Sequence, residues 1–210
     1  LFDLTLLPQA EKILLVLARR SNEELFDMGD LMTSVLNSSK GKIYSAMVNY
    51  SLCYARHYRK DTDSRLDDPI KEEFTKRLDP KIEPSVGFSV TLGKFLANLC
   101  YLDKQWVKEN LNKIFPKEDE THWKAAFTGY LAYSGTVYIK IYNLLKSNGH
   151  YSKALNTEFK DPHITEHLVQ HICIGYMEGL ENLDDKASLI NQMLDIWNSH
   201  HITELIRFLK

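Results

Sequence analysis

Cysteine is scarce in this sequence. Its three cysteines, Cys53, Cys100 and Cys173, lie far apart, and no two of them form a Cys-x-x-Cys pair. An odd, widely spaced set of this kind excludes a disulfide framework and a zinc ribbon. Each cysteine stands among apolar neighbours, so we expect buried, reduced thiols and a cytoplasmic location.

Long apolar runs are also missing, and neither positive nor negative charge is in large excess. The longest apolar run near the start covers six residues, 13–18, whereas a membrane-spanning helix needs about 20. Residues 1–105 hold 15 basic and 15 acidic side chains, and residues 106–210 hold 11 and 13. Neither half is basic enough to form a broad nucleic-acid surface. We therefore expect no membrane partner, and a nucleic-acid-binding helical array is only an alternative.

Motifs for nucleotide binding and nucleophilic catalysis are absent as well. There is no Gly-x-Ser-x-Gly string and no glycine-rich phosphate loop. The paired carboxylates Asp67-Asp68 and Glu72-Glu73 stand among basic residues, which predicts a solvated, salt-bridged surface. The sequence therefore predicts no catalytic residue, no cofactor site and no metal site, and the chain itself is expected not to be an enzyme.

Helical periodicity is what the sequence does have. Apolar residues recur at three-to-four spacing through nearly the whole chain, and no convincing strand alternation interrupts them. The expected helices cover a segment from Pro8 and then about 28–36, 42–59, 70–78, 88–99, 104–115, 121–131, 137–145, 151–159, 162–173, 186–199 and 202–210. This pattern predicts an all-α fold, an irregular helical-hairpin array of the HEAT or TPR α-solenoid kind. A single globular helical bundle is the alternative.

Domain organisation follows from the polar stretches and the two ends. The segments 60–69 and 79–87 are rich in charge and proline and are the two candidate sub-boundaries. The sequence starts at Leu1 and stops within the amphipathic pattern 202–210. We expect residues 1–210 to be a single all-helical region and a fragment of a longer chain.

Histidines at helical spacing form the sharpest local pattern. His163, Glu166 and His167 make a His-x-x-Glu-His string, and His171 continues the same helix flank. In inverted zinc peptidases the two histidines of such a string bind zinc and the glutamate activates water. Because His163 directly follows Pro162 and no third ligand is evident, we expect a partly exposed histidine flank. A zinc-dependent hydrolase is the alternative.

Aromatic residues are dense, with 11 Tyr, 9 Phe and 3 Trp. Tyr130, Tyr133, Tyr138 and Tyr142 cluster along the chain with few lysines nearby. A groove that tracks phosphates needs more positive charge. We expect these rings to fill gaps between helices, and a protein-binding face is the second possibility because tyrosine is common in interface hot spots.

Four segments carry a resemblance to a known class of proteins. They are Thr121-His-Trp-Lys-Ala-Ala-Phe-Thr-Gly-Tyr-Leu131, residues 137–142, residues 149–155 and residues 37–52. Together they resemble the C-terminal helical regions of very large bacterial proteins of anti-phage defence. In these proteins a STAND-type NTPase or a sirtuin-like NADase precedes the helical array.

The resemblance covers about half of the sequence and implies different roles for the helical array and for an N-terminal module. The array would sense a partner, and the N-terminal module would carry out the NTPase or NADase chemistry. No catalytic residue transfers to this chain, because the motifs of those modules do not occur in it. We therefore predict a non-catalytic helical scaffold or sensor that recognises another protein or other domains of its own chain.

Overall fold

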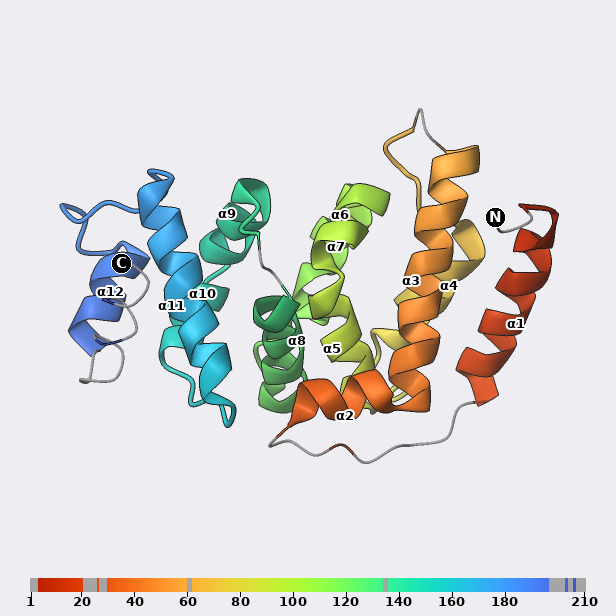
Figure 1. Ribbon diagram of the computed structural model, residues 1–210, viewed down its shortest axis with the longest axis horizontal. Coiled ribbons are helices and arrows are strands. Elements are labelled where there is room, and N and C mark those ends of the chain that lie inside the picture. The colour runs from red at the N-terminus through yellow and green to blue at the C-terminus, as the bar shows by residue number, and fades with distance from the viewer. Residues whose placement is uncertain are drawn as a thin grey trace. The chain divides into compact units, whose positions relative to one another are not determined.

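The computed structural model describes residues 4–20, 26, 30–59, 62–133, 136–196, 203 and 206. These residues form twelve α-helices and one short 3-10 turn, Leu4–Leu6 (Figure 1). Within the same residues, β-structure is limited to one isolated bridge between Ser64 and Asp103. The predicted all-α fold is confirmed, and the arrangement fits an array or a bundle of helices.

The chain divides into two compact units, Leu1–Tyr130 and Leu131–Lys210. Both predicted sub-boundaries, 60–69 and 79–87, lie inside the first unit. Unit 1 contains α1 (Leu7–Arg20), α2 (Leu31–Asn37), α3 (Ser39–Tyr58), α4 (Asp68–Arg77), α5 (Val86–Lys94), α6 (Leu96–Leu102), α7 (Lys104–Ile114) and most of α8 (Glu120–Tyr133).

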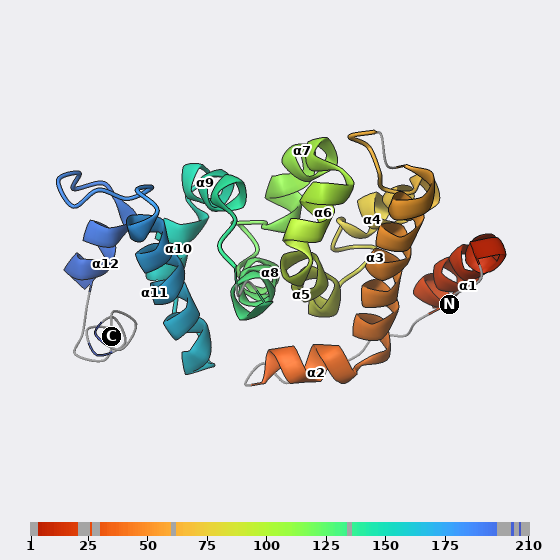
Figure 2. The ribbon, with the colours of Figure 1, turned by 45° about the horizontal axis from the view of Figure 1, so that its top comes forward.

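Helix α3 is the centre of unit 1, because it contacts α1, α2, α5 and α6. Figures 1 and 2 both show α2 lying across the start of α3. The sequence predicts a break over residues 37–41, but the helices are interrupted only at Ser38, whose hydroxyl accepts a hydrogen bond from the Gly41 amide. A Cβ atom at Gly41 would lie 1.9 Å from the carbonyl oxygen of Val35, so only glycine fits this corner.

Helices α5 and α8 approach each other through glycine. A Cβ atom at Gly93 of α5 would lie 1.8 Å from the carbonyl oxygen of Ala126 in α8, and one at Gly129 of α8 would lie 2.2 Å from that of Val90. The two backbones therefore touch without side chains between them. The predicted helix 88–99 is instead two helices, because α5 ends at Lys94 and α6 begins at Leu96.

The polar loop before α4 is tied to the junction of α6 and α7. The amides of Arg65 and Leu66 both donate to the carbonyl oxygen of Leu102. The carboxylate of Asp103 accepts from Lys71 Nζ at 2.7 Å and from the Ser64 hydroxyl at 3.2 Å. These contacts order a segment whose sequence predicts a solvated linker, and they bury Leu66 completely.

Unit 2 contains α9 (Ile139–Ser147), α10 (His150–Leu155), α11 (Pro162–Met177) and α12 (Leu189–Ile196). Helix α10 contacts α9 and α12, and α11 contacts α12. Asp161 caps α11 and Pro162 opens it, as the sequence predicts. Helix α10 ends at Leu155, four residues before the predicted limit. The predicted helix 202–210 lies outside the described residues, apart from positions 203 and 206.

Candidate functional site

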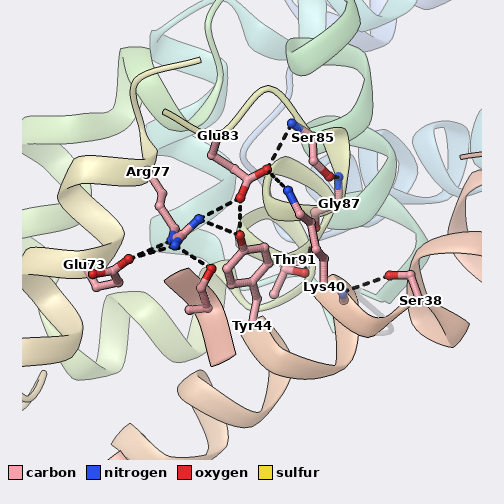
Figure 3. Close-up of polar contacts among 11 residues, drawn as sticks. Ser38, Lys40, Tyr44, Glu73, Arg77, Glu83, Ser85, Gly87 and Thr91 are labelled. Atoms are coloured by element: carbon pink, nitrogen blue, oxygen red, sulfur yellow. Dashed lines mark hydrogen bonds and ion pairs between the residues drawn. The ribbon is translucent and has the colours of Figure 1, made fainter. Parts of the chain in front are cut away.

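Unit 1 encloses a network of charged and polar side chains, which we call the Glu83 network. It consists of Lys40 and Tyr44 from α3, Glu73 and Arg77 from α4, and Glu83 from the segment between α4 and α5. Figure 3 shows Lys40, Tyr44 and Arg77 converging on the Glu83 carboxylate, with Glu73 on the other side of Arg77. All five residues are buried.

Local turns bring Glu83 to the centre of this network. The Asp79 carboxylate accepts from the Lys81 amide, and the Asp79 carbonyl oxygen accepts from the amides of Ile82 and Glu83. This Asx turn reverses the chain directly after α4. Glu83 therefore points back at Arg77, six positions earlier in the sequence, and lies between α3 and α4.

The Glu83 carboxylate accepts hydrogen bonds from four donors. Its Oε1 atom lies 2.6 Å from Lys40 Nζ and 3.1 Å from the Ser85 amide. Its Oε2 atom lies 2.8 Å from Arg77 Nη1 and also accepts from the Tyr44 hydroxyl. A carboxylate has about four acceptor positions, so its hydrogen-bonding capacity is filled by the protein itself.

Arg77 and its partner Glu73 link the network to helix α1. Its Nε atom donates to Glu73 Oε1 at 2.9 Å, and its Nη2 atom donates to the carbonyl oxygen of Ala18 in α1 at 2.6 Å. Glu73 also pairs with Arg19 of α1 at 3.1 Å. Two buried cations, Lys40 and Arg77, thus balance two buried carboxylates, and the network joins α1, α3 and α4.

The pKa shifts agree with this geometry. Burial alone would raise the pKa of the Glu83 carboxyl, but hydrogen bonds from Lys40 and Tyr44 lower it below its usual value. Burial and the neighbouring Glu83 charge raise the pKa of Tyr44 well above its usual value. Glu83 is therefore ionised and Tyr44 neutral at physiological pH, which is the state that satisfies the hydrogen bonds between them and their neighbours.

The network corrects the prediction of a solvated surface for the paired carboxylates. Asp68 and Glu72 are exposed, as predicted, but Glu73 and Asp67 are buried, with exposed fractions of 4% and 3%. Glu72 and Glu73 differ because consecutive positions of a helix point in different directions, whereas Asp67 precedes the first turn of α4. The sequence alone carries no signal for Lys40 and Glu83, which are 43 positions apart.

A hollow of about 150 Å³ adjoins the network. Its lining mixes apolar and polar side chains, with Arg77, Glu83, Ser89 and His122 among the polar ones. His122 Nδ1 lies 2.8 Å from Asp119 Oδ2, and its buried Nε2 atom has no hydrogen-bond partner. Within the described part of the chain no hydrogen bond joins Ser89 to His122, although an activated serine needs a base in contact. The arrangement supplies an oriented imidazole beside a small hollow.

The residues of the His-x-x-Glu-His string have different surroundings in unit 2. His163 is exposed, and its Nδ1 atom lies 3.1 Å from Glu166 Oε2. His171 is buried, and its Nδ1 atom lies 3.0 Å from the Tyr151 hydroxyl. His167 is half-buried between them. Over the ranges that the structure describes, no group of three or more His, Cys, Asp or Glu side chains is arranged to hold a metal ion.

The tyrosine cluster separates into buried and exposed members. Tyr130 is buried in unit 1, with its ring centroid 5.7 Å from that of Phe127. Tyr142 is buried in unit 2 and donates to Glu181 Oε1 at 2.7 Å. These two rings fill the core, as predicted, whereas Tyr133 and Tyr138 are 46% and 55% exposed.

The three cysteines are free thiols. Cys173 is buried, as predicted, whereas Cys53 and Cys100 are only half-buried. Burial raises the pKa of Cys100 and of Cys173 to about 11. These two thiols are therefore protonated near neutral pH and are poor nucleophiles.

Comparison of the chain with protein families, with curated proteins and with solved structures finds no match in any of the three. Where the structure describes the chain, none of its helices is long and apolar enough to cross a membrane.

Proposed function

We propose that this chain is a non-catalytic helical scaffold that recognises another protein through exposed tyrosines of unit 2. The observation that carries the proposal is the exposure of Tyr133 and Tyr138, at the two sides of the connection from α8 to α9. Ile139, the first residue of α9, is 46% exposed as well. Tyrosine offers large apolar area and a polar hydroxyl at low entropic cost, which suits a protein interface.

The buried polar contacts support this reading. The Glu83 network joins three helices of unit 1, and Glu181 in unit 2 accepts from Tyr142, from Lys146 Nζ at 2.6 Å and from the Leu189 amide at 2.7 Å. Fully satisfied buried networks hold helices in one arrangement. Rigid helices present exposed side chains with little entropic loss on binding.

We infer a context for this recognition from the resemblance to helical regions of bacterial defence proteins. The scaffold would act in the cytoplasm of a bacterium, where binding of its partner would be transmitted to an NTPase or NADase module. That module, and not the helical region, would carry the chemistry. Rigid-body movement of packed helices is the physical route for such coupling.

A comparison of three forms of the protein tests the proposal. The wild-type chain, the double variant Tyr133→Ala/Tyr138→Ala and the control Tyr58→Ala are used to capture proteins from the source cells. Tyr58 is 57% exposed, so the control removes a comparable ring from α3. We expect a specific partner to be captured by the wild type and by the control and lost in the double variant. Capture of the same partner by all three, or of none by the wild type, contradicts the proposal.

A further inference from the structure

Helix α1 and the 3-10 turn before it expose apolar side chains along one side. These residues, which we call the N-terminal stripe, are Leu6, Ile13, Val16 and Leu17, with exposed fractions of 48%, 59%, 43% and 44%. The buried residues of α1, Leu7, Leu15 and Ala18, lie on the opposite side, and α1 packs against α3 and α4. Isolated exposed leucines are common on proteins, but three large apolar side chains on one side of α1, with Leu6 just before them, are of the kind that binds a partner.

The N-terminal stripe has a basic margin. Lys12 and Arg20 are exposed and lie beside the stripe at helical spacing. Arg19 is exposed too, but it pairs with Glu73. The acidic residue of α1, Glu11, is half-buried and accepts from the Tyr50 hydroxyl at 3.2 Å. A partner of this stripe therefore needs apolar residues with acidic neighbours.

Unit 2 exposes residues of that composition at the end of α11, in the following loop and on α12. Met177 at the end of α11, Leu183 in the following loop and Leu194 of α12 are 68%, 47% and 44% exposed. The exposed acidic residues among them are Glu178, Asp184 and Asp185, with Lys186 as the opposing charge. We call these three apolar and three acidic residues the acidic end surface.

The loop of the acidic end surface is held in place by α12. The side-chain amide of Asn191 donates to the carbonyl oxygens of Leu183 and Asp185, at 2.8 and 2.7 Å. Asp184 and Ala187 are fixed by amide hydrogen bonds to the side chains of Asn182 and Asp185. A loop ordered in this way loses little entropy when it is bound.

We propose that the N-terminal stripe of one copy of this chain docks on the acidic end surface of a second copy. The two surfaces combine exposed apolar residues with charges of opposite sign, so they are complementary within a single sequence. They belong to different parts of the chain, so the contact is heterologous. When one such contact joins two copies, one copy still has a free N-terminal stripe and the other a free acidic end surface, to which a further copy can bind. The contact does not involve Tyr133 or Tyr138 of the proposed function, so a result that disproves one proposal does not bear on the other.

Sedimentation of the chain at increasing concentration tests the proposal. We expect the average mass to rise with protein concentration at low salt. We expect it to fall in about 1 M NaCl, where the Debye length is about 3 Å. Ile13→Asp and the double variant Asp184→Lys/Asp185→Lys each remove one surface by changing exposed side chains, so both should keep their helical content and sediment as monomers.

An equimolar mixture of the two variants gives the sharpest outcome. Each variant retains the surface that the other has lost, so the mixture should form a dimer and nothing larger. Ile82→Asp and Glu72→Lys/Glu118→Lys are the matched controls, because they change exposed residues outside both surfaces. These controls should assemble like the wild type.

Three results would overturn the head-to-tail contact. They are a wild-type chain that stays monomeric at every concentration, assembly that persists in either single-surface variant, and a mixture of the variants that stays monomeric or grows beyond the dimer. All of the variants leave Tyr133 and Tyr138 unchanged, so the partner captured under the proposed function is scored independently.

Discussion

The ammonium of Lys40 lies 2.6 Å from the carboxylate of Glu83, and both side chains are almost fully removed from solvent, with 4% and 1% exposed. One charge comes from the first turn of α3 and the other from the segment before α5. A buried pair of this kind contributes little net stability relative to apolar residues of the same shape. Loss of one partner is nevertheless costly, because it leaves the other charge buried.

We therefore predict that Lys40→Met lowers the free energy of unfolding by about 3–5 kcal/mol. The substitution keeps an unbranched side chain, one heavy atom shorter, but removes a donor to Glu83 Oε1. Urea denaturation followed by circular dichroism measures the change. Arg59→Met is the control, since Arg59 pairs with the exposed Asp68, and it should cost less than about 1 kcal/mol. Equal losses in the two variants would mean that burial of the Lys40 pair has no energetic consequence.

The second prediction concerns Asp67, which is buried ahead of α4 and has an Oδ2 atom without a hydrogen-bond partner. Burial, with a further contribution from the charge of Glu11, raises the pKa of Asp67 from 3.8 to about 6. The folded protein therefore binds more protons than the unfolded chain between these two pH values. The contribution of Asp67 to stability is complete below about pH 3.8 and is lost as the pH rises through about 6.

The substitution Asp67→Asn should remove this pH dependence. Near pH 4 the variant and the wild type should be similar in stability. Near pH 8 the variant should be more stable by an amount on the order of 2–3 kcal/mol, because the introduced amide carries no charge beside Glu11. Urea midpoints at the two pH values measure the difference. Asp68→Asn, which changes an exposed neighbour, should change stability equally at the two pH values. A pH-independent difference for Asp67→Asn would disprove the raised pKa of Asp67.

The third prediction concerns the contact of α5 with α8. Gly93→Ala places a methyl group 1.8 Å from the carbonyl oxygen of Ala126, so the two backbones must separate. We expect a loss of about 3 kcal/mol in the free energy of unfolding. At Gly179 nothing lies within 4 Å of an added Cβ, but φ is +73°. Gly179→Ala should therefore cost only about 1 kcal/mol, from backbone strain. Thermal melts of both variants compare the two effects, and a larger loss at Gly179 would contradict the close approach.

The structure of α11 shows how much local signals can specify. Asp161 and Pro162 start this helix because a side-chain acceptor and a preset φ angle act within one turn. Ser38 and Gly149 mark helix boundaries in the same way, through a cap and a positive φ. The apolar periodicity between such signals was sufficient to predict an all-α fold.

Burial, in contrast, follows from the packed fold. Glu73 belongs to a run of charged residues that reads as solvent-exposed, yet it is buried because Arg77 of the same helix and Arg19 of α1 neutralise it. The interruption of the predicted helix 88–99 at Phe95 occurs where α5 lies against the backbone of α8. Local sequence is enough to show where helices begin and which sides are apolar, since these properties depend on neighbours within one or two turns. Which charges are enclosed and where backbones touch depends on residues tens of positions apart, and those residues meet only when the helices pack.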